Sequence, residues 1–286
     1  MIPLTSFRIA LIGGLTCLGV YLFVTAPPPL AEAAARTEAQ CERPVQVLFD
    51  SANAINQAAR NVYTREIVGA GLKAGLKFDE DWQEPDVEAG PLPALFLRLM
   101  AEKLEAMPPQ LGLYLGSDAP ISPSNLFSGA QATQFAEVKA TRAPVFSSDT
   151  GIGQIAMYPD IAAVAPCVTC HNEHPDSPKV DWQLGDVMGA TTWTWSSASV
   201  GSEVYLTVLE AMFDAVALAY QDYLTKTAGF AEPVPLGDWP KQVKALPQVE
   251  EFIDKVRFEA GPELLRVMLP MQRGLFESGD LKCALS

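Results

Sequence analysis

Two cysteines and a histidine stand together in the middle of the chain, in the order Cys167-Val168-Thr169-Cys170-His171. Two thiols separated by two residues can each bond to one vinyl group of a porphyrin, and a histidine that directly follows can then bind the iron. A chain of 286 residues with five cysteines and two histidines rarely contains this pattern by chance. We therefore expect one covalently bound heme c, with Cys167 and Cys170 as its anchors and His171 as an iron ligand.

The same residues allow two other interpretations. A thioredoxin-like dithiol has its Cys-x-x-Cys at the start of a helix within a βαβ unit, and the sequence pattern here shows no such unit. A zinc site needs four ligands, and Cys167, Cys170 and His174 have no second pair of Cys or His nearby. Both alternatives stay open, although each lacks part of the pattern that it needs.

The chain as a whole is acidic, with a formal net charge of −14. Nucleic acids are bound through clustered Lys and Arg, and no basic run appears, so we expect no nucleic-acid partner. The hydrophobic fraction of 49% is enough to bury a large core, either in one large domain or in a domain with a helical extension. An acidic surface suits a basic docking partner, although it also serves solubility.

An uncharged apolar run from Ile9 to Ala26 follows Arg8 and ends at three prolines. As a helix it would span roughly 27 Å, which is near the lower limit for crossing a bilayer. We expect an N-terminal membrane anchor, with a signal peptide cleaved near Ala31 and Ala33 as the alternative. Both interpretations put the rest of the chain on the periplasmic side of the cytoplasmic membrane, either anchored or soluble. Heme c is attached in that compartment.

The spacing of apolar residues predicts an α+β fold. A long helix should begin at Pro44 and run to Val62, and a second should begin at Pro93 and stop before Pro108. Short segments bounded by Gly and Pro then predict an antiparallel sheet with a turn at Asp149-Thr150-Gly151. The expected strands are 111–115, 144–147, 152–158 and 190–196. Because the Cys-x-x-Cys-His motif lies between the last two, we expect it in a loop or short helix beside the sheet.

Beyond the last strand the pattern becomes helical. An apolar stripe should pack one helix against the domain, and two further helices are expected around 249–258 and 262–268, after a proline-rich loop. The stripe consists of Leu206, Leu209, Phe213, Val216, Tyr220 and Leu224. The expected organisation is an anchor or signal peptide (1–30), a linker (31–40), a sheet-containing heme domain (41–198) and a helical C-terminal extension (199–286).

A longer set of residues around the motif carries a family resemblance. These residues are Tyr158-Pro159-Asp160, His171-Asn172, His174-Pro175, Ser177-Pro178-Lys179, Asp181-Trp182 and Gly185-Asp186-Val187. In this order they resemble the PAS-like single c-type heme domain family. That family includes a standalone cyanobacterial heme protein and the extracytoplasmic sensor regions of bacterial kinases and cyclases. The resemblance covers about 41–198, and it implies an antiparallel sheet flanked by helices that holds one heme.

The resemblance also implies a second axial ligand on the iron, a cysteine thiolate, and Cys41 stands at the matching position. A cysteine just ahead of a helix has its thiolate stabilised by the helix dipole. A disulfide between Cys41 and Cys283 is the alternative, because these two cysteines are left over in an oxidising compartment. Met157 and Met188 are further candidate ligands.

Other residues near the motif have candidate supporting roles. Lys179 and Arg142 could pair with the heme propionates, and Trp182 could pack against the edge of the macrocycle. His174 is too close to His171 in the chain to reach the opposite face of the same heme without a sharp fold. We interpret it as a residue that orders or gates the loop.

These expectations together indicate a membrane-tethered, extracytoplasmic redox or diatomic-gas sensor-like protein, with NO, CO and O2 as candidate gases. The residues from about 199 onward resemble no kinase or cyclase core, so a signal or electron should pass to a redox or signalling protein partner. The alternative is an electron-transfer cytochrome subunit docked to a larger membrane complex. We expect no enzyme, because a heme enzyme needs a distal acid–base group and His174 is the only spare histidine.

Overall fold

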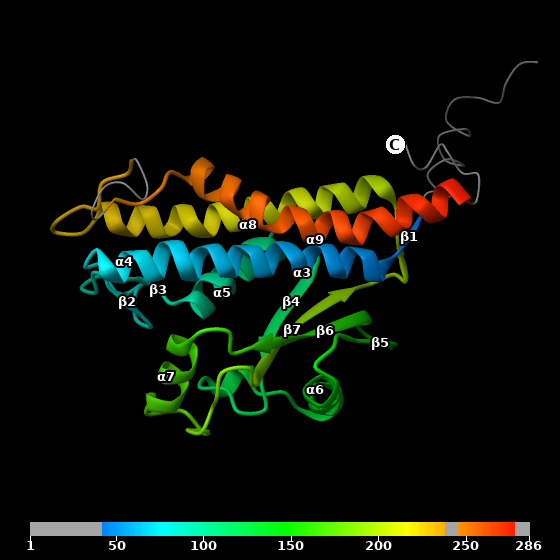
Figure 1. Cartoon of the computed structure of the whole chain (residues 1–286), viewed down its shortest axis with the longest axis horizontal. Helices are drawn as coiled ribbons and strands as arrows, with labels where there is room; N and C mark the ends of the chain where they lie inside the picture. Colours follow the sequence, from blue (N-terminus) through cyan, green and yellow to red (C-terminus); the bar gives the residue numbers. More distant parts are fainter. Residues whose placement is uncertain (1–41, 238–244, 278–286) are drawn as a thin grey trace, which may run out of the picture. The chain divides into compact units, whose positions relative to one another are not determined.

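The computed structural model of the protein describes residues 42–237 and 245–277, all within one compact unit that begins at Glu42. These residues form an α+β fold in which helices flank a four-stranded antiparallel sheet (Figure 1). The expected membrane anchor, Cys41 and Cys283 lie outside the described residues. None of the helices within the described ranges is long and apolar enough to span a bilayer.

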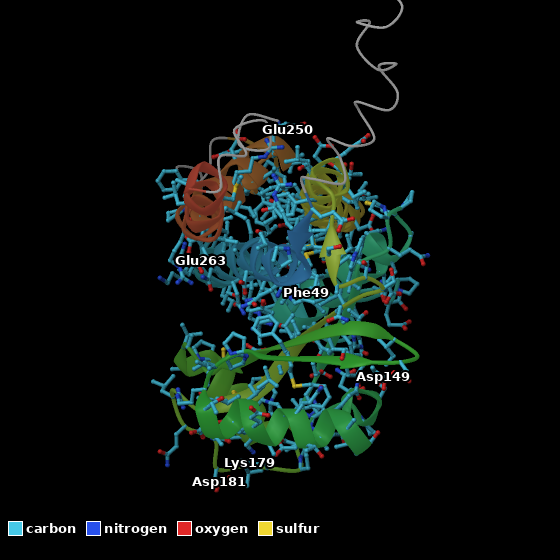
Figure 2. The ribbon with its side chains drawn as sticks, turned by 90° about the vertical axis from the view of Figure 1, so that its right-hand side faces the viewer. Phe49, Asp149, Lys179, Asp181, Glu250 and Glu263 are labelled. Carbon is cyan, nitrogen blue, oxygen red and sulfur yellow. The ribbon has the colours of Figure 1, made fainter. Side chains whose placement is uncertain are left out.

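The four predicted strands are confirmed, and they pair in the order β4-β7-β6-β5 with every pair antiparallel. The strands are β4 (Gly112–Gly116), β5 (Val145–Asp149), β6 (Gly153–Ile161) and β7 (Val187–Trp195). The predicted turn joins β5 to β6 at Asp149, whose Oδ1 accepts hydrogen bonds from the backbone N–H groups of Gly151 and Ile152. Figure 2 shows Asp149 at the tip of this hairpin. Two short pairs complete the strands: β1 (Arg43–Pro44) with β8 (Ser199–Val200), and β2 (Phe78–Asp79) with β3 (Gly90–Pro91).

The long predicted helix is α3 (Val45–Val62), and it continues through a π-helical turn, η1 (Tyr63–Gly69), into α4 (Ala70–Lys73). Its apolar positions recur at helical spacing and are fully buried at Leu48, Ala52, Ile55 and Ala59. The second predicted helix is α5 (Pro93–Glu105), which has proline in its first turn, where the missing N–H costs no helical hydrogen bond. Both helices are confirmed.

A second, polar side of α3 faces the sheet. The Tyr158 hydroxyl of β6 donates to Asp50 at 2.6 Å, and Trp193 Nε1 of β7 donates to Asn53 at 3.4 Å. One helical turn before the π-helical segment, Arg60 forms an ion pair with Asp160 near the end of β6. These contacts recur every three to seven residues along α3, so they fix how the helix lies across the sheet.

Helix α6 (Gly129–Thr141) was not predicted from the sequence. It covers the sheet face opposite α3, where Phe135 and Val138 pack with Met157, Val187 and Ala190. These two residues are the ones that the helix buries. The apolar periodicity that would have revealed the helix is therefore too short to recognise.

Helix α8 (Ser202–Ala228) confirms the predicted helix but only half of the predicted stripe. Val216, Tyr220 and Leu224 are buried, whereas Leu206 is 49% exposed, and Leu209 and Phe213 are only partly buried. In the first turns the buried positions are instead Tyr205, Val208 and Met212. The buried face is rotated there because Tyr205 packs on α3 and shares a 2.8 Å hydrogen bond with Ser51.

The two helices predicted near the C-terminus are one continuous helix, α9 (Val249–Glu277). The sequence suggested a break because Pro262 cannot donate a helical hydrogen bond. In the structure Pro262 is exposed, while Phe252, Val256 and Ala260 are buried in the main core. The packing of this face outweighs the loss of one hydrogen bond.

Helices α8 and α9 share one hydrophobic core with α3 and α5. Phe252 of α9 stacks on Tyr220 of α8 with ring centroids 4.2 Å apart. Tyr63 stacks on Phe96 at 4.0 Å, and Phe252 meets both rings edge to face. Such pairs add stability beyond the apolar area that they bury.

A substitution tests whether α9 contributes to this core. We expect Phe252→Ala to lower the free energy of unfolding by about 3–5 kcal/mol, because it leaves a cavity among packed aromatic rings. The matched control is Phe258→Ala on the same helix, where the side chain is 86% exposed and the change should stay within about 0.5 kcal/mol. Urea unfolding followed by circular dichroism measures both. Equal effects of the two substitutions would contradict the shared core.

Candidate heme site

The predicted motif lies on a short helix, α7 (Ala165–Glu173), which connects β6 to β7 at one end of the sheet (Figure 1). Pro166 stands in its first turn, as expected for a helix start. Cys170 and His171 follow Cys167 by three and four residues, so all three side chains lie on one face of the helix. Both cysteines are free thiols. The helix therefore presents two thiols and an imidazole on the same side.

The His171 imidazole is partly buried, and its Nδ1 atom is buried with no hydrogen-bond partner among the described residues. Burial lowers the pKa of His171 below its usual value, the Asp160 carboxylate partly opposes this, and His174 adds to it. His171 is therefore neutral at pH 7, which is the form that binds a metal.

The Cys170 side chain reaches the surface, but its thiol is partly desolvated by the surrounding protein. This desolvation raises the pKa of Cys170, and the negative charges of Glu80 and Glu173 act in the same direction. A reactive dithiol needs the opposite, a thiol with a lowered pKa. In addition, α7 joins two antiparallel strands and not the parallel strands of a βαβ unit. The structure therefore argues against the thioredoxin-like interpretation.

The zinc interpretation also lacks support in the structure. Among residues 42–237 and 245–277, no three His, Cys, Asp or Glu side chains are grouped as metal ligands. His174 is three residues beyond His171, and its ring contacts are to other partners, described below. Nothing in the described part of the chain completes a tetrahedral site around Cys167 and Cys170.

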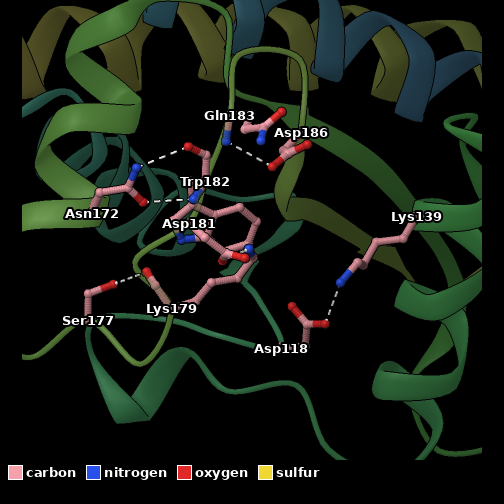
Figure 3. Close-up of polar contacts among 9 residues, drawn as sticks. All are labelled: Asp118, Lys139, Asn172, Ser177, Lys179, Asp181, Trp182, Gln183 and Asp186. Atoms are coloured by element: carbon pink, nitrogen blue, oxygen red, sulfur yellow. Dashed lines mark hydrogen bonds and ion pairs between the residues drawn. The ribbon is translucent and has the colours of Figure 1, made fainter.

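Asn172 ties α7 to the loop that precedes β7. Its Nδ2 donates to the backbone oxygen of Trp182 at 3.0 Å, and its Oδ1 accepts from the Trp182 N–H at 2.8 Å (Figure 3). This reciprocal pair of hydrogen bonds resembles the pairing of two residues in neighbouring β-strands, and it fixes the distance between the helix and the loop. The Trp182 side chain is only 4% exposed.

Trp182 forms a small hydrophobic cluster with Ala162 and Met188, and Cys167 and Val168 pack against that cluster. The structure thus brings the predicted residue Trp182 beside the first cysteine of the motif. Met188, predicted as a candidate iron ligand, belongs to the same cluster. Met157 packs with Phe135 on the α6 side of the sheet, and not with the residues of α7.

Lys179 lies over the Trp182 ring, with Nζ 4.4 Å from the ring centroid. Its ammonium also pairs with Asp181 and lowers the pKa of that carboxyl group, while its backbone oxygen accepts a hydrogen bond from Ser177 Oγ at 2.8 Å (Figure 3). Arg142 donates to the backbone oxygen of Gly185 at 2.7 Å. Both predicted propionate partners are thus held beside the loop between α7 and β7.

His174 uses both of its ring nitrogens within the protein. Nδ1 accepts the backbone N–H of Asp176 at 3.1 Å, so Nε2 carries the proton and lies 2.8 Å from Glu80 Oε1. The second contact joins α7 to the segment between β2 and β3. An iron bond would have to break one of these contacts, so the geometry supports the interpretation of His174 as a residue that orders the loop.

Three residues near the motif were missed as site residues by the sequence reasoning. Asp160 acts on His171 through its charge, Arg60 pairs with Asp160, and Glu80 holds His174. The sequence contains one signal for these three residues: Asp160 belongs to Tyr158-Pro159-Asp160, which is among the segments that carry the family resemblance. Arg60 is 100 residues away from Asp160 in sequence, and only the fold brings them together.

The donor set suits a heme. It combines two free thiols, a neutral imidazole on the same helix face, and a buried Nδ1 to which no residue of 42–237 or 245–277 forms a hydrogen bond. Large apolar side chains also lie exposed on both sides of the motif in sequence, with Val164 37%, Val180 64% and Leu184 61% exposed. A bound porphyrin is an apolar plane that such side chains can cover. Cys41, the predicted second ligand, lies outside the described residues, and its role stays a prediction.

Comparison with known proteins supports part of the resemblance. A family model described as Tll0287-like (Tll0287) matches residues 34–196, which is more than half of the 286 residues and includes α3, the whole sheet and α7. A search of curated proteins gave no match, and neither did a search of solved structures. The matched residues coincide closely with the segment 41–198 on which the resemblance rests. The chain therefore belongs to the Tll0287-like family.

Proposed function

We propose that this chain is an extracytoplasmic protein that carries one heme c and acts as a redox or diatomic-gas sensor-like module. One observation carries the proposal: Cys167, Cys170 and the neutral imidazole of His171 lie on one face of α7. When bound, the heme would supply reversible one-electron chemistry and an iron atom that small gases can bind. Membership of the Tll0287-like family is compatible with this role but does not by itself specify it.

Each protein residue then has a defined task. Cys167 and Cys170 hold the group covalently, and His171 provides the iron ligand. Asn172 and Trp182 fix α7 against the loop before β7. Lys179, which lies over the Trp182 ring, is a candidate partner for a propionate.

The proposal locates the protein on the periplasmic side of the cytoplasmic membrane. The apolar run from Ile9 to Ala26 behind Arg8 is the supporting feature, as an anchor in the bilayer or as a cleaved signal peptide. Electrons or signals would pass to a protein partner. The excess of negative charge favours a partner with a basic docking surface.

A second candidate function is electron transfer as a cytochrome subunit of a larger membrane complex. It is favoured by the exposure of Cys170, because a porphyrin bonded to a surface sulfur has an edge within reach of a docked protein. An electron carrier needs that exposed edge, whereas a gas sensor needs an exchangeable position on the iron.

An enzymatic role is not part of the proposal. Peroxidase-type chemistry needs an acid–base group that can move a proton near the iron. His174 would be the candidate, and both of its nitrogens are engaged by Glu80 and the backbone of Asp176.

The covalent attachment is tested with cysteine variants. We expect Cys167→Ala and Cys170→Ala together to abolish heme that survives denaturation, because both thioether bonds are lost. Thr169→Ala, at the exposed position between them, is the matched control and should keep the heme. Heme staining of denaturing gels, after expression with a cytochrome c maturation system, gives the readout. Retained staining in the double variant would refute attachment at the motif.

The second iron ligand is tested at Cys41. From the resemblance we expect Cys41→Ser to change the absorption spectrum of the oxidised heme and to raise its reduction potential, because a thiolate donates electron density to the iron. Spectra and potentiometric titration of the full chain measure both. An unchanged spectrum and potential would remove Cys41 from the iron and leave the disulfide with Cys283 as the better account of this residue.

Gas binding separates the two candidate functions. For a sensor-like module we expect the reduced protein to bind CO and NO with a shift of the Soret band, because the second iron ligand is exchangeable. An electron-transfer subunit would keep both iron ligands and bind neither gas. Absorption spectra recorded before and after addition of each gas distinguish the two functions. Absence of any shift, together with copurification with a membrane complex in mild detergent, would favour the electron-transfer function.

A further inference from the structure

We propose that Trp182 and Lys179 together bind one propionate carboxylate of the heme, with the indole N–H of Trp182 as a hydrogen-bond donor and the ammonium of Lys179 as the opposite charge. This inference rests on the proposed function, because it assumes that a heme is bonded to α7. It assigns to Trp182 a polar role in addition to its apolar packing.

The first support is a buried hydrogen-bond donor. Trp182 is only 4% exposed, and its Nε1 atom is buried with no acceptor among residues 42–237 and 245–277. An indole N–H can donate but cannot accept, and the N–H of a buried tryptophan usually has a partner. Leaving such a donor unpaired costs free energy. The Trp182 indole therefore favours a ligand that brings its own acceptor.

The second support is a positive charge beside the same ring. Lys179 Nζ lies 4.4 Å from the centroid of the Trp182 indole ring (Figure 3). A neutral donor and an ammonium group that lie together suit an anionic acceptor, because hydrogen bonds to a charged oxygen are stronger than those to a neutral one. The chemistry of the two side chains thus selects a carboxylate.

The ion pair that holds Lys179 in this structure is weak enough to be exchanged. Its partner is Asp181, whose side chain is 82% exposed, and the Lys179 side chain is itself 31% exposed. Ion pairs this close to water contribute little stability. A carboxylate at the buried indole N–H would be screened less by solvent. Lys179 can therefore leave Asp181 for that carboxylate and move off the ring that it covers.

The third support is the position of Trp182 against α7. Its backbone N–H and C=O pair with the Asn172 side chain at 2.8 and 3.0 Å, and Cys167 packs against the hydrophobic cluster that contains the Trp182 ring. A porphyrin bonded to Cys167 would therefore begin beside this cluster. Because a heme carries two propionates, its covalent attachment would bring to Trp182 and Lys179 the anionic acceptor that their chemistry selects.

The experiment compares Trp182→Phe and Lys179→Met with the unmodified, full heme-loaded chain. Phenylalanine keeps an aromatic ring in the cluster but cannot donate a hydrogen bond, and methionine keeps an unbranched side chain without the charge. Resonance Raman spectroscopy detects the bending vibration of the heme propionates, which shifts when a hydrogen bond to the carboxylate is lost. We expect this band to shift in both variants.

Potentiometric titration gives a second readout. The indole N–H and the ammonium group offset the negative charge of the carboxylate, and without either of them that charge stabilises the oxidised iron more strongly. At a fixed potential we expect the oxidised-to-reduced ratio to rise on the order of threefold in each variant. A merely structural role of Trp182 could change the potential, but it would leave the propionate band in place.

Trp193→Phe is the matched control. Trp193 is also buried, but its Nε1 donates to Asn53 at 3.4 Å and its ring belongs to the main core. The same substitution there removes an indole N–H that already has an acceptor within the protein, so the propionate band and the potential should stay unchanged. An unshifted band in Trp182→Phe, or an equal shift in Trp193→Phe, would overturn the inference.

Lys179→Met keeps the inference testable if Trp182→Phe does not fold, because the Lys179 side chain is partly exposed. An unshifted band in Lys179→Met would remove the cation from the site and overturn the proposed pair. Heme staining separates this inference from the proposed function. If the unmodified chain carries covalent heme and the band stays in place in the variants, the propionate site is wrong and the heme assignment stands. If the unmodified chain carries no covalent heme, both are wrong.

Discussion

Helix α3 contacts both layers of the protein, and the position of the candidate site depends on this double contact. On one side its apolar residues form the core with α5, α8 and α9. On the other side Asp50, Asn53 and Arg60 bind Tyr158, Trp193 and Asp160 of the sheet. Polar contacts of this kind contribute little net stability, but an unpaired buried group is costly, so they specify one arrangement of the helix on the sheet. That arrangement in turn fixes the position of the end of β6 and of the start of α7 after it.

The candidate site is consequently built from distant parts of the chain. Helix α7 supplies Cys167, Cys170 and His171, the loop before β7 supplies Trp182, and the segment between β2 and β3 supplies Glu80. Each part is held by its own contact to α7 or to β6. A porphyrin bonded to α7 would therefore meet a surface that is already ordered, which lowers the entropic cost of orienting the iron. The family match covers residues 34–196, a range that contains all of these residues.

Sequence reasoning predicted the features that depend on local pattern. The apolar spacing from Val45 to Val62 revealed α3, and short segments bounded by Gly and Pro revealed the sheet. Sequence reasoning failed where tertiary packing decides whether a helix forms or where it ends. Helix α6 buries only Phe135 and Val138, and α9 continues through Pro262 because its opposite face is packed. At the site, the spacing of the motif predicted that Cys167, Cys170 and His171 share a heme, and this stays a prediction. No local signal could join Arg60 to Asp160 across 100 residues.

The central claim is that a porphyrin is bonded to the two sulfur atoms of α7. The most direct measurement is extraction of the purified protein with acidified organic solvent, followed by protease digestion and mass spectrometry of the peptide that contains Cys167 and Cys170. The account predicts that the colour stays with the polypeptide and that this peptide carries the added mass of one heme. A colourless polypeptide whose peptide has the mass of its sequence alone would contradict the account.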